Sequence, residues 1–337
     1  MPNNIVLMKT TTIHVLSKLL NISPSTVSRA LNDHVNIAPA TKARVLEAAK
    51  KLNYEPNLFA VGLRQNNSRE IAIIAPSLSG FFYDSFISAA EAEAKKLGYS
   101  LVILLSGDDP EIERQNLKTC KQRRVSGVML CVTSKTIQEE YLQNFSEYDI
   151  PILFFDKVLE MLGATKACVD DERAATLVAE SLLKHNKKKI LSIFGDIRFS
   201  ISQKRLSAYL QVFAYAGESQ SIIIEHAQSA SESCDLVLAG LSRNTKPDAI
   251  FCMSDEILTG AMKAIQILGL KIPNDVGVIA ISNGFFPKLY HPEITYAETS
   301  GYGLGVLALK GLIGLINKTD SSRTYIQESK LIEGHSL

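Results

Sequence analysis

After residue 69, short apolar runs alternate with longer amphipathic stretches, and this alternation constrains the fold more than any other feature of the sequence. Runs that are apolar on both faces are typical of parallel strands that helices cover on either side. The predicted strands cover residues 71–75, 101–105, 128–132, 152–155, 190–194, 222–224, 249–253 and 276–281, and the predicted helices cover 86–97, 112–123, 171–185, 203–216 and 255–268. Four of these strands precede residue 160 and four follow it. The pattern therefore predicts two doubly wound α/β subdomains, whose ligands bind beyond the carboxyl ends of the strands.

The length of 337 residues exceeds one typical core and suggests two or three compact units. A composition of 46% hydrophobic and 21% charged residues is that of a globular protein, neither disordered nor fibrous. No apolar run approaches the roughly 20 residues of a membrane helix, and the first residues lack the pattern of a secretory signal. We therefore expect a cytoplasmic location and no membrane partner.

The cysteines are widely and irregularly spaced, and no two of them form a Cys-x-x-Cys pair. The five are Cys120, Cys131, Cys168, Cys234 and Cys252. This spacing argues against disulfides and against a structural zinc site. Cys131 and Cys252 lie inside apolar runs, where a free cysteine behaves as a small buried hydrophobe. We expect no metal and no cofactor.

The net charge of +1 conceals a division of the chain near residue 64. Residues 1–64 hold eight Lys and Arg against three acidic residues, a net charge of +5. The remainder holds 28 basic and 32 acidic residues, a net charge of −4. A small basic head joined to a mildly acidic body is expected where only the head meets a polyanion such as DNA.

Three short helices are predicted in the basic head. The first follows Thr12, the second has Ser23 as its N-cap and Pro24 at its first helical position, and the third covers residues 39–52. Two short helices joined by a tight turn and braced by a third form a helix-turn-helix, which lays its second helix in the major groove. A generic helical cap is the alternative. The residues expected inside are Val15, Leu16, Leu19, Leu20, Val27, Ala30, Leu31, Val45, Leu46, Ala49 and Leu52.

The second helix has an outer face rich in hydroxyl and amide groups, which suits phosphates and base edges. Its sequence at 23–32, Ser-Pro-Ser-Thr-Val-Ser-Arg-Ala-Leu-Asn, strongly resembles the lactose-repressor (LacI/GalR) family of transcription regulators, as does Leu-Asn-Tyr-Glu-Pro-Asn at 52–57. The resemblance implies that Pro24, Ser25 and Arg29 read bases. An arginine can pair bidentately with guanine, a discrimination worth ~1–3 kcal/mol. The implied phosphate-contacting or scaffold positions are Thr26, Ser28, Asn32 and Tyr54.

Residues 57–64 resemble the hinge of that family, where two subunits pair short helices in the minor groove of the operator. The resemblance implies that Leu63 is inserted between base pairs and that Asn57 and Ala60 also lie at the DNA; an ordinary linker residue is the alternative for Leu63. A helix of this length is marginal in water, so it is expected to order only on DNA with a partner subunit. Gly62 weakens it further, by up to ~1 kcal/mol relative to Ala.

The resemblance extends over roughly residues 12–317 and implies a body similar to periplasmic sugar-binding proteins. Carboxylate and guanidinium groups suit adjacent sugar hydroxyls, and aromatic rings cover apolar faces of a sugar. The implied ligand positions are Phe81, Phe82, Asp156, Arg205, Asp255, Ser282 and Asn283. Two alternatives stay open, a helix-capping role for Asp255 and a surface ion pair for Arg205. Further aromatic residues either add stacking surface or belong to the core or an interface, namely Phe199, Phe285, Phe286 and Tyr290.

Three departures from the family pattern leave the ligand class open. Ser79-Gly80 stand where the family has Asn-Pro, Asp156-Lys157 where it has Asp-Arg, and Ser282 where it has an aspartate. The last change removes a hydroxyl acceptor. A neutral Ser282-Asn283 pair could accommodate an anionic or N-substituted ligand that a carboxylate would repel.

An enzyme would need a reacting group of side chains, and the sequence holds no HExxH, Walker or GxSxG motif. The glycines at 301, 303 and 305 have no predicted strand before them, which a dinucleotide-binding motif requires, so we expect them to serve helix packing. The residues predict a protein that is not an enzyme. A cytoplasmic small-molecule sensor with constitutive or vestigial DNA binding is the alternative to a regulator.

The resulting prediction is an α/β chain with an all-α helix-turn-helix head and two doubly wound, periplasmic-binding-protein-like subdomains. The head covers residues 10–56, the hinge 57–68 and the ligand-binding and dimerisation body 69–337. One subdomain combines 69–160 with 295–320, and the other combines 161–294 with 321–337. The expected partners are a double-stranded DNA operator, a sugar-like effector and a second copy of the chain. The end of the chain shows no leucine heptads, which favours a dimer over a tetramer.

Overall fold

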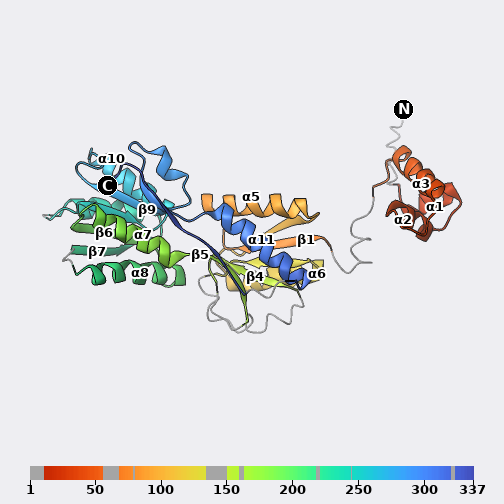
Figure 1. Cartoon of the computed structure of the whole chain (residues 1–337), viewed down its shortest axis with the longest axis horizontal. Helices are drawn as coiled ribbons and strands as arrows, with labels where there is room; N and C mark the ends of the chain where they lie inside the picture. Colours follow the sequence, from red (N-terminus) through yellow and green to blue (C-terminus); the bar gives the residue numbers. More distant parts are fainter. Residues whose placement is uncertain are drawn as a thin grey trace, which may run out of the picture. The chain divides into compact units, whose positions relative to one another are not determined.

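The computed structural model of the chain describes residues 11–55, 68–78, 80–133, 150–158, 163–217, 221–243, 245–319 and 323–337 (Figure 1). The chain divides into two compact units, Met1–Ser68 and Arg69–Leu337, which are called the head and the body below. The hinge positions Asn57, Ala60, Gly62 and Leu63 lie outside the described residues, as does Ser79. Among the helices of the described ranges, none is long and apolar enough to cross a membrane.

The head consists of three helices, α1 (Ile13–Leu20), α2 (Pro24–Leu31) and α3 (Pro39–Lys51), as the sequence predicted. Helix α1 ends at Asn21, whose left-handed backbone turns the chain toward α2. The helices share a small core made of Leu16, Val27, Ala30, Val45 and Ala48.

The predicted interior of the head included four residues that are exposed in the structure. Val15, Leu19, Leu46 and Leu52 are exposed, by 36% to 62% of their surface, so their predicted burial was wrong. Helices of only 8 to 13 residues contact each other along narrow stripes, so each of them buries one or two residues and leaves the flanking apolar side chains at the edge.

The body contains two sheets of six strands. The order in the first sheet is β11-β5-β4-β3-β1-β2 and in the second β12-β10-β9-β8-β6-β7. All neighbouring strands are parallel except the β10–β12 pair. The strands of the first sheet are β1 (Glu70–Ala75), β2 (Ser100–Leu105), β3 (Gly127–Leu130), β4 (Ile152–Phe155), β5 (Thr165–Val169) and β11 (Thr324–Gln327). Those of the second are β6 (Lys189–Phe194), β7 (Ser221–His226), β8 (Ala249–Cys252), β9 (Gly277–Ser282), β10 (Thr295–Glu298) and β12 (Lys330–Ile332).

Helices cover both faces of the first sheet, as the doubly apolar strands predicted. In β1, Ile71 and Ile73 face the core shared with α5 (Phe81–Lys96) and α11 (Gly301–Asn317), while Ala72 and Ile74 face the core shared with α6 (Pro110–Arg123). In the second sheet, α7 (Asp171–Lys184) packs against α8 (Ser200–Ala216), and α9 (Ala230–Leu241) packs against α10 (Asp255–Ile267). The two sheets with their helices form an N-terminal and a C-terminal subdomain.

The sequence missed strands β5, β10, β11 and β12 and helix α9. The four strands have only three to five residues, and two of them are edge strands with polar or exposed residues, so they lack the continuous apolar run that marked the others. Helix α9 begins Ala-Ser-Glu-Ser, which offers no apolar face at its start.

The chain passes between the subdomains three times, between β5 and α7, between β10 and α11, and between β11 and β12. Each passage lies later than the predicted subdomain boundaries after 160, 294 and 320. The reason is the same in all three cases, because a strand that the sequence missed extends the preceding sheet before the chain leaves it.

Helix α11 packs along α5 (Figure 1). Two glycines of α11 approach the backbone of α5 closely. A Cβ atom on Gly301 would lie 2.4 Å from the carbonyl oxygen of Phe82, and one on Gly305 would lie 2.4 Å from that of Phe86. The predicted packing role is confirmed for Gly301 and Gly305, whereas a Cβ atom on Gly303 would meet the side chain of Gln327. Strand β10 does precede them, however, so the expectation that no strand stands before this run was wrong.

Candidate DNA-binding face and effector site

The first turn of α2 carries a compact group of hydroxyls. The Ser23 hydroxyl accepts a hydrogen bond from the backbone N–H of Thr26 at 3.1 Å, which caps the helix as predicted. The same hydroxyl lies 2.8 Å from the hydroxyl of Ser25 and 2.8 Å from that of Thr26. Ser25 is exposed and Thr26 half-buried. The capping residue Ser23 therefore fixes two hydroxyls at the N-terminus of α2, where phosphates and bases are expected to lie.

The other implied DNA-binding residues of the head differ in exposure and in their hydrogen bonds. Arg29 is exposed, as a base-reading residue must be. The Asn32 amide instead donates to the carbonyl of Ser28 in its own helix at 2.9 Å. Tyr54 is half-buried against the core of the head, which fits its implied scaffold role. Lys42 of α3 pairs with Asp33 after α2 at 2.6 Å and so ties the two helices together.

In the body, the implied ligand positions lie where helices begin or strands end. Phe81 and Phe82 open α5, Asp156 follows β4, and Asp255 opens α10. Arg205 lies in the second turn of α8, and Ser282 with Asn283 ends and follows β9. The carboxyl ends of parallel strands are the usual place for ligands in such sheets.

Asp156 is held by a tyrosine that the sequence analysis did not single out. The hydroxyl of Tyr83 donates to Oδ2 of Asp156 at 2.7 Å, across 73 positions of sequence. Burial, followed by the nearby Asp156 charge, raises the pKa of Tyr83 well above its ordinary value. Tyr83 therefore stays protonated and remains a donor. Asp156 itself has a left-handed backbone, at φ 58°, directly after the end of β4.

Arg205 forms a buried ion pair, so the alternative of a surface pair was wrong. Its Nε donates to Oδ1 of Asp171 at 2.9 Å, its Nη2 lies 2.7 Å from the same oxygen, and its Nη1 donates to the carbonyl of Met253 at 3.0 Å. Arg205 is 6% exposed. Burial raises the pKa of Asp171, and the Arg205 charge opposes that shift. Asp171, which the sequence analysis missed, fixes the guanidinium in place.

Asp255 bonds to the end of β9 and does not cap its helix. The N-cap of α10 is Ser254, whose hydroxyl accepts from the N–H of Ile257 at 3.3 Å. The two Asp255 oxygens accept from the hydroxyl of Ser282 and, at 3.0 Å, from the backbone N–H of Asn283. Burial raises the pKa of Asp255, while these two donors and Arg205 lower it. A carboxylate thus stands beside Ser282 although Ser282 replaces the aspartate of the family pattern.

These residues share one electrostatic environment. Arg205 acts on Asp255, and the charge of Asp156 raises the pKa of Asp171. Phe81 stacks on Phe285, with ring centroids 4.3 Å apart and planes at 15°, and meets Phe286 edge-on. The ammonium of Lys157 lies 4.0 Å from the ring centroid of Phe199. Direct contacts therefore join Phe81, Asp255, Ser282 and Asn283 in one group and Arg205 with Asp171 in another, and the charge of Arg205 connects the two groups.

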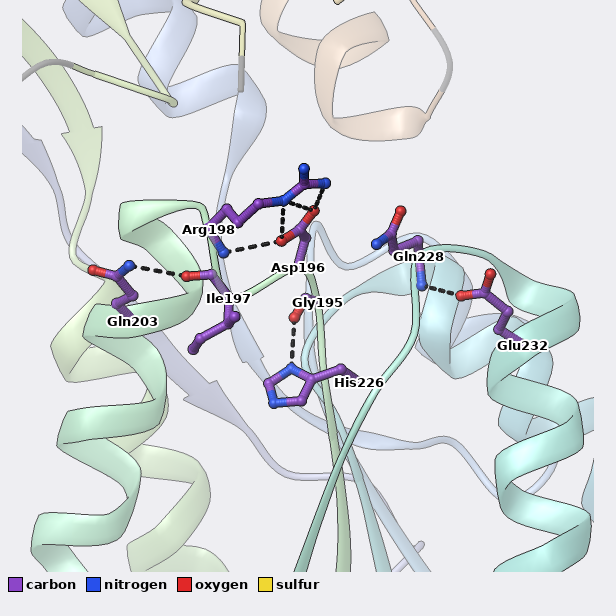
Figure 2. A network of polar contacts seen from close by, with 8 residues as sticks. All are labelled: Gly195, Asp196, Ile197, Arg198, Gln203, His226, Gln228 and Glu232. Atoms are coloured by element: carbon purple, nitrogen blue, oxygen red, sulfur yellow. Dashed lines mark hydrogen bonds and ion pairs between the residues drawn. The ribbon is translucent and has the colours of Figure 1, made fainter. Parts of the chain in front are cut away.

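A second polar network lies at the ends of β6 and β7, and the sequence analysis did not find it (Figure 2). The guanidinium of Arg198 folds back onto the carboxylate of Asp196, with Nε 2.9 Å from Oδ2. Arg198 lowers the pKa of Asp196 through these hydrogen bonds. The ring nitrogen Nδ1 of His226 lies 2.9 Å from the carbonyl oxygen of Gly195. The available signal was the Asp-Ile-Arg triplet at 196–198, one residue after a predicted strand.

Within the described ranges, no group of three or more His, Cys, Asp and Glu could hold a metal ion. All five cysteines are buried. Burial raises the pKa of Cys120, Cys131 and Cys168 to about 12, so these thiols stay protonated at neutral pH.

Comparison with known proteins decides the family. The family described as periplasmic binding proteins and sugar binding domain of LacI family matches residues 68–333, and that of bacterial regulatory proteins, lacI family, matches residues 12–57. The chain belongs to the LacI family. It is accordingly a ligand-responsive, DNA-binding transcription regulator and not an enzyme, with the fold expected from its sequence.

Relatives resemble this LacI-family chain over nearly its whole length. The HTH-type transcriptional regulator RegA of Clostridium saccharobutylicum is 26% identical and the match covers 97% of this chain and 99% of the relative. The ribose operon repressor of Halalkalibacterium halodurans is 29% identical over 91% of each. The solved Lac repressor dimer bound to operator and the anti-inducer ONPF superposes with a TM-score of 0.87 at 21% identity, covering 97% of this chain and 99% of that one, which shows a shared fold.

Proposed function

We propose that two copies of this LacI-family chain bind a pseudo-palindromic operator in the cytoplasm and repress transcription in response to a sugar-like effector. The observation that carries the proposal is the capped first turn of α2, where Ser23 fixes the hydroxyls of Ser25 and Thr26 on a head of net charge +5. In this proposal Pro24, Ser25 and Arg29 read bases. Thr26, Ser28 and Asn32 contact phosphates, and Tyr54 braces the head.

The hinge residues Asn57, Ala60 and Leu63 complete the proposed DNA interface, with Leu63 inserted between base pairs in the minor groove. Leu63→Ala is expected to abolish the preference for one operator while leaving effector binding intact. Arg29→Ala is expected to relax base preference at one position of each half-site. Operator affinity equal to that of the wild type in Leu63→Ala would refute the inserted leucine.

The proposed effector site consists of Phe81, Phe82, Asp156, Arg205, Asp255, Ser282 and Asn283. Its support is the fixed geometry of two carboxylates and one guanidinium, each held by a neighbour: Asp156 by Tyr83, Arg205 by Asp171 and Asp255 by Ser282. Such fixed charges suit the adjacent hydroxyls of a sugar. A relative named ribose operon repressor also supports a sugar-like effector. In this proposal the Asp255 carboxylate beside Ser282 serves as the hydroxyl acceptor in place of the family aspartate.

The experiment that tests the proposal is selection of bound duplexes from a randomised library, followed by affinity measurements at several salt concentrations. A specific regulator prefers one pseudo-palindrome by ~10³-fold or more and loses affinity steeply with salt, because each phosphate contact releases counterions. Equal affinity for the selected and random duplexes would refute operator recognition and favour a small-molecule sensor. A thermal-shift screen against sugars, sugar acids and nucleobases identifies the effector.

A further inference from the structure

The residues that follow β9 touch both subdomains at once. Asn283 belongs to the C-terminal subdomain, yet its side-chain Nδ2 donates to the carbonyl of Phe81 at 3.1 Å and to the hydroxyl of Ser85 at 3.2 Å, both in the first turns of α5. Its Oδ1 accepts from the backbone N–H of Gly301 at 2.9 Å, at the start of α11. One amide group therefore bonds to the two helices that cover one face of the N-terminal sheet.

The corner of α5 and α11 that receives this amide is closely packed. Gly301 approaches α5 so closely that a Cβ atom would lie 2.4 Å from the carbonyl oxygen of Phe82 and 2.5 Å from the hydroxyl of Ser85. Helices α5 and α11 also pack along each other over much of their length. A movement of Asn283 relative to this corner is therefore a movement of one subdomain relative to the other.

Aromatic rings reinforce the same connection. Phe285, two residues after Asn283, stacks on Phe81 with 4.3 Å between ring centroids, and Phe286 meets Phe81 edge-on at 4.9 Å. Such pairs add to the stability gained from burial alone. Phe81 and Phe285 are 39% and 46% exposed, so the contact lies at the surface and can open without disrupting a core.

The backbone of Asn283 leads into the proposed effector site. Its N–H donates to Oδ2 of Asp255 at 3.0 Å, and Ser282 bonds to the other oxygen of the same carboxylate. Both Asp255 oxygens are thus engaged by the β9 end. An effector that hydrogen-bonds to this carboxylate must compete with the backbone N–H of Asn283. The side-chain amide of the same residue bonds to α5 and α11.

We propose that residues 282–286 form a latch between the subdomains and that Asn283 couples Asp255 to the position of α5 and α11. The coupling rests on the proposed effector site, whereas the latch itself does not. When the effector takes the Asp255 carboxylate, the latch loosens and the angle between the subdomains changes. Asn283 also lies in the proposed effector site, and toward DNA it is a positioning residue, because it acts on DNA binding through the orientation of the N-terminal subdomain.

The test measures the distance between subdomains in the full-length chain by electron–electron double resonance. Spin labels are placed at Lys96→Cys on α5 and Lys184→Cys on α7, both exposed by 67% of the side chain. The five natural cysteines are buried, so labelling is confined to the added thiols. Neither operator nor effector is required, so the result is independent of the proposed function.

In the wild type without operator or effector, one distance between the labels is expected to dominate. Any second arrangement of the subdomains is expected to stay below roughly 10% of the molecules. Asn283→Ala is expected to raise the second arrangement by roughly tenfold relative to the first, because three hydrogen bonds between subdomains are lost. The matched control is Asn116→Ala, since the Asn116 amide also donates to a carbonyl, that of Leu105 at 3.0 Å, but within one subdomain. It is expected to leave the distribution unchanged.

An unchanged distribution in Asn283→Ala overturns the latch. If that variant does not fold, Phe285→Ala decides by the same reading, because truncating a ring that is 46% exposed leaves the core intact. Asp255→Ala tests the coupling. It is expected to broaden the distribution, and the double variant Asp255→Ala/Asn283→Ala is expected to be no broader than Asn283→Ala, since both changes act through one contact. Additive broadening would overturn the coupling while leaving the latch.

Discussion

Ser23 carries two duties at the start of α2, since it caps the helix and holds the hydroxyls of Ser25 and Thr26. Ser23→Ala is expected to destabilise the head by ~1 kcal/mol, because the N–H of Thr26 loses its acceptor. Hydrogen exchange of the α2 amides in the full chain measures this. The matched control is Thr12→Ala, since Thr12 stands at the same position before α1 but makes no side-chain capping bond. Equal protection of α2 in Ser23→Ala and wild type would contradict the assignment.

The buried pair of Asp171 and Arg205 predicts a large effect of removing one partner. Asp171→Ala leaves a guanidinium that is 6% exposed without its carboxylate, and breaking such a pair costs about 3–5 kcal/mol. Chemical denaturation of the body measures the loss. Asp196→Ala is the control, because its partner Arg198 is 64% exposed and can turn to solvent. Equal losses in the two variants would show that burial of the pair does not matter.

The same carboxyl predicts a direction for the pH dependence of stability. Burial raises the pKa of Asp171 above its ordinary value of 3.8, so the folded chain keeps this proton to a higher pH than the unfolded chain. The contribution of this proton to the free energy of unfolding is fully present below pH 3.8. It is lost as the pH rises through the pKa of Asp171 in the folded chain. Asp171→Asn is expected to flatten the dependence of the unfolding free energy on pH in that window. A slope identical to that of the wild type would show that Asp171 has an ordinary pKa.

At the residue scale, the sequence identified the positions of the proposed effector site but not the residues that hold them. Tyr83 and Asp156 are 73 positions apart and Asp171 and Arg205 are 34 apart, and no periodicity links either pair. Such partners meet only in the folded chain, where the start of α5 lies beside the end of β4 and helix α7 packs against α8. The sequence likewise has a neutral Ser282-Asn283 pair in place of the family aspartate, but it could not show that the Asp255 carboxylate bonds directly to that pair.

The close packing of α11 on α5 depends on glycine at two positions, which gives a prediction for a whole element. Gly301→Ala places a methyl group 2.4 Å from the carbonyl oxygen of Phe82, so α11 must shift, at an expected cost of about 1–3 kcal/mol. Thermal unfolding of the body measures it. Gly303→Ala is the control on the same helix, because its methyl group meets only the end of the flexible Gln327 side chain. A Gly301→Ala variant as stable as Gly303→Ala would contradict this packing.

At the element scale, the predicted strands and helices were found wherever an apolar run was long and continuous, as in β1, β4 and β6. The missed strands β5, β10 and β11 share a different property. Each lies next to a passage between subdomains, where pairing with a neighbouring strand, rather than a local apolar pattern, defines the element. The predicted subdomain boundaries were wrong for that reason, although the count of two subdomains was right.

At the scale of the whole molecule, a head and a body that form separate compact units can affect each other only through linkage. If the effector changes operator affinity by some factor, the operator must change effector affinity by the same factor. The effector found in the thermal-shift screen is titrated into the full chain with and without the selected operator, which measures the change in effector affinity. Titration of the operator with and without effector measures the change in operator affinity. The body alone, residues 69–337, is expected to fold, to bind effector and to be insensitive to the operator. If the operator altered effector affinity in the body alone, the coupling would not run through the head, and the proposed path from Asp255 through α5 to the DNA would have to be replaced.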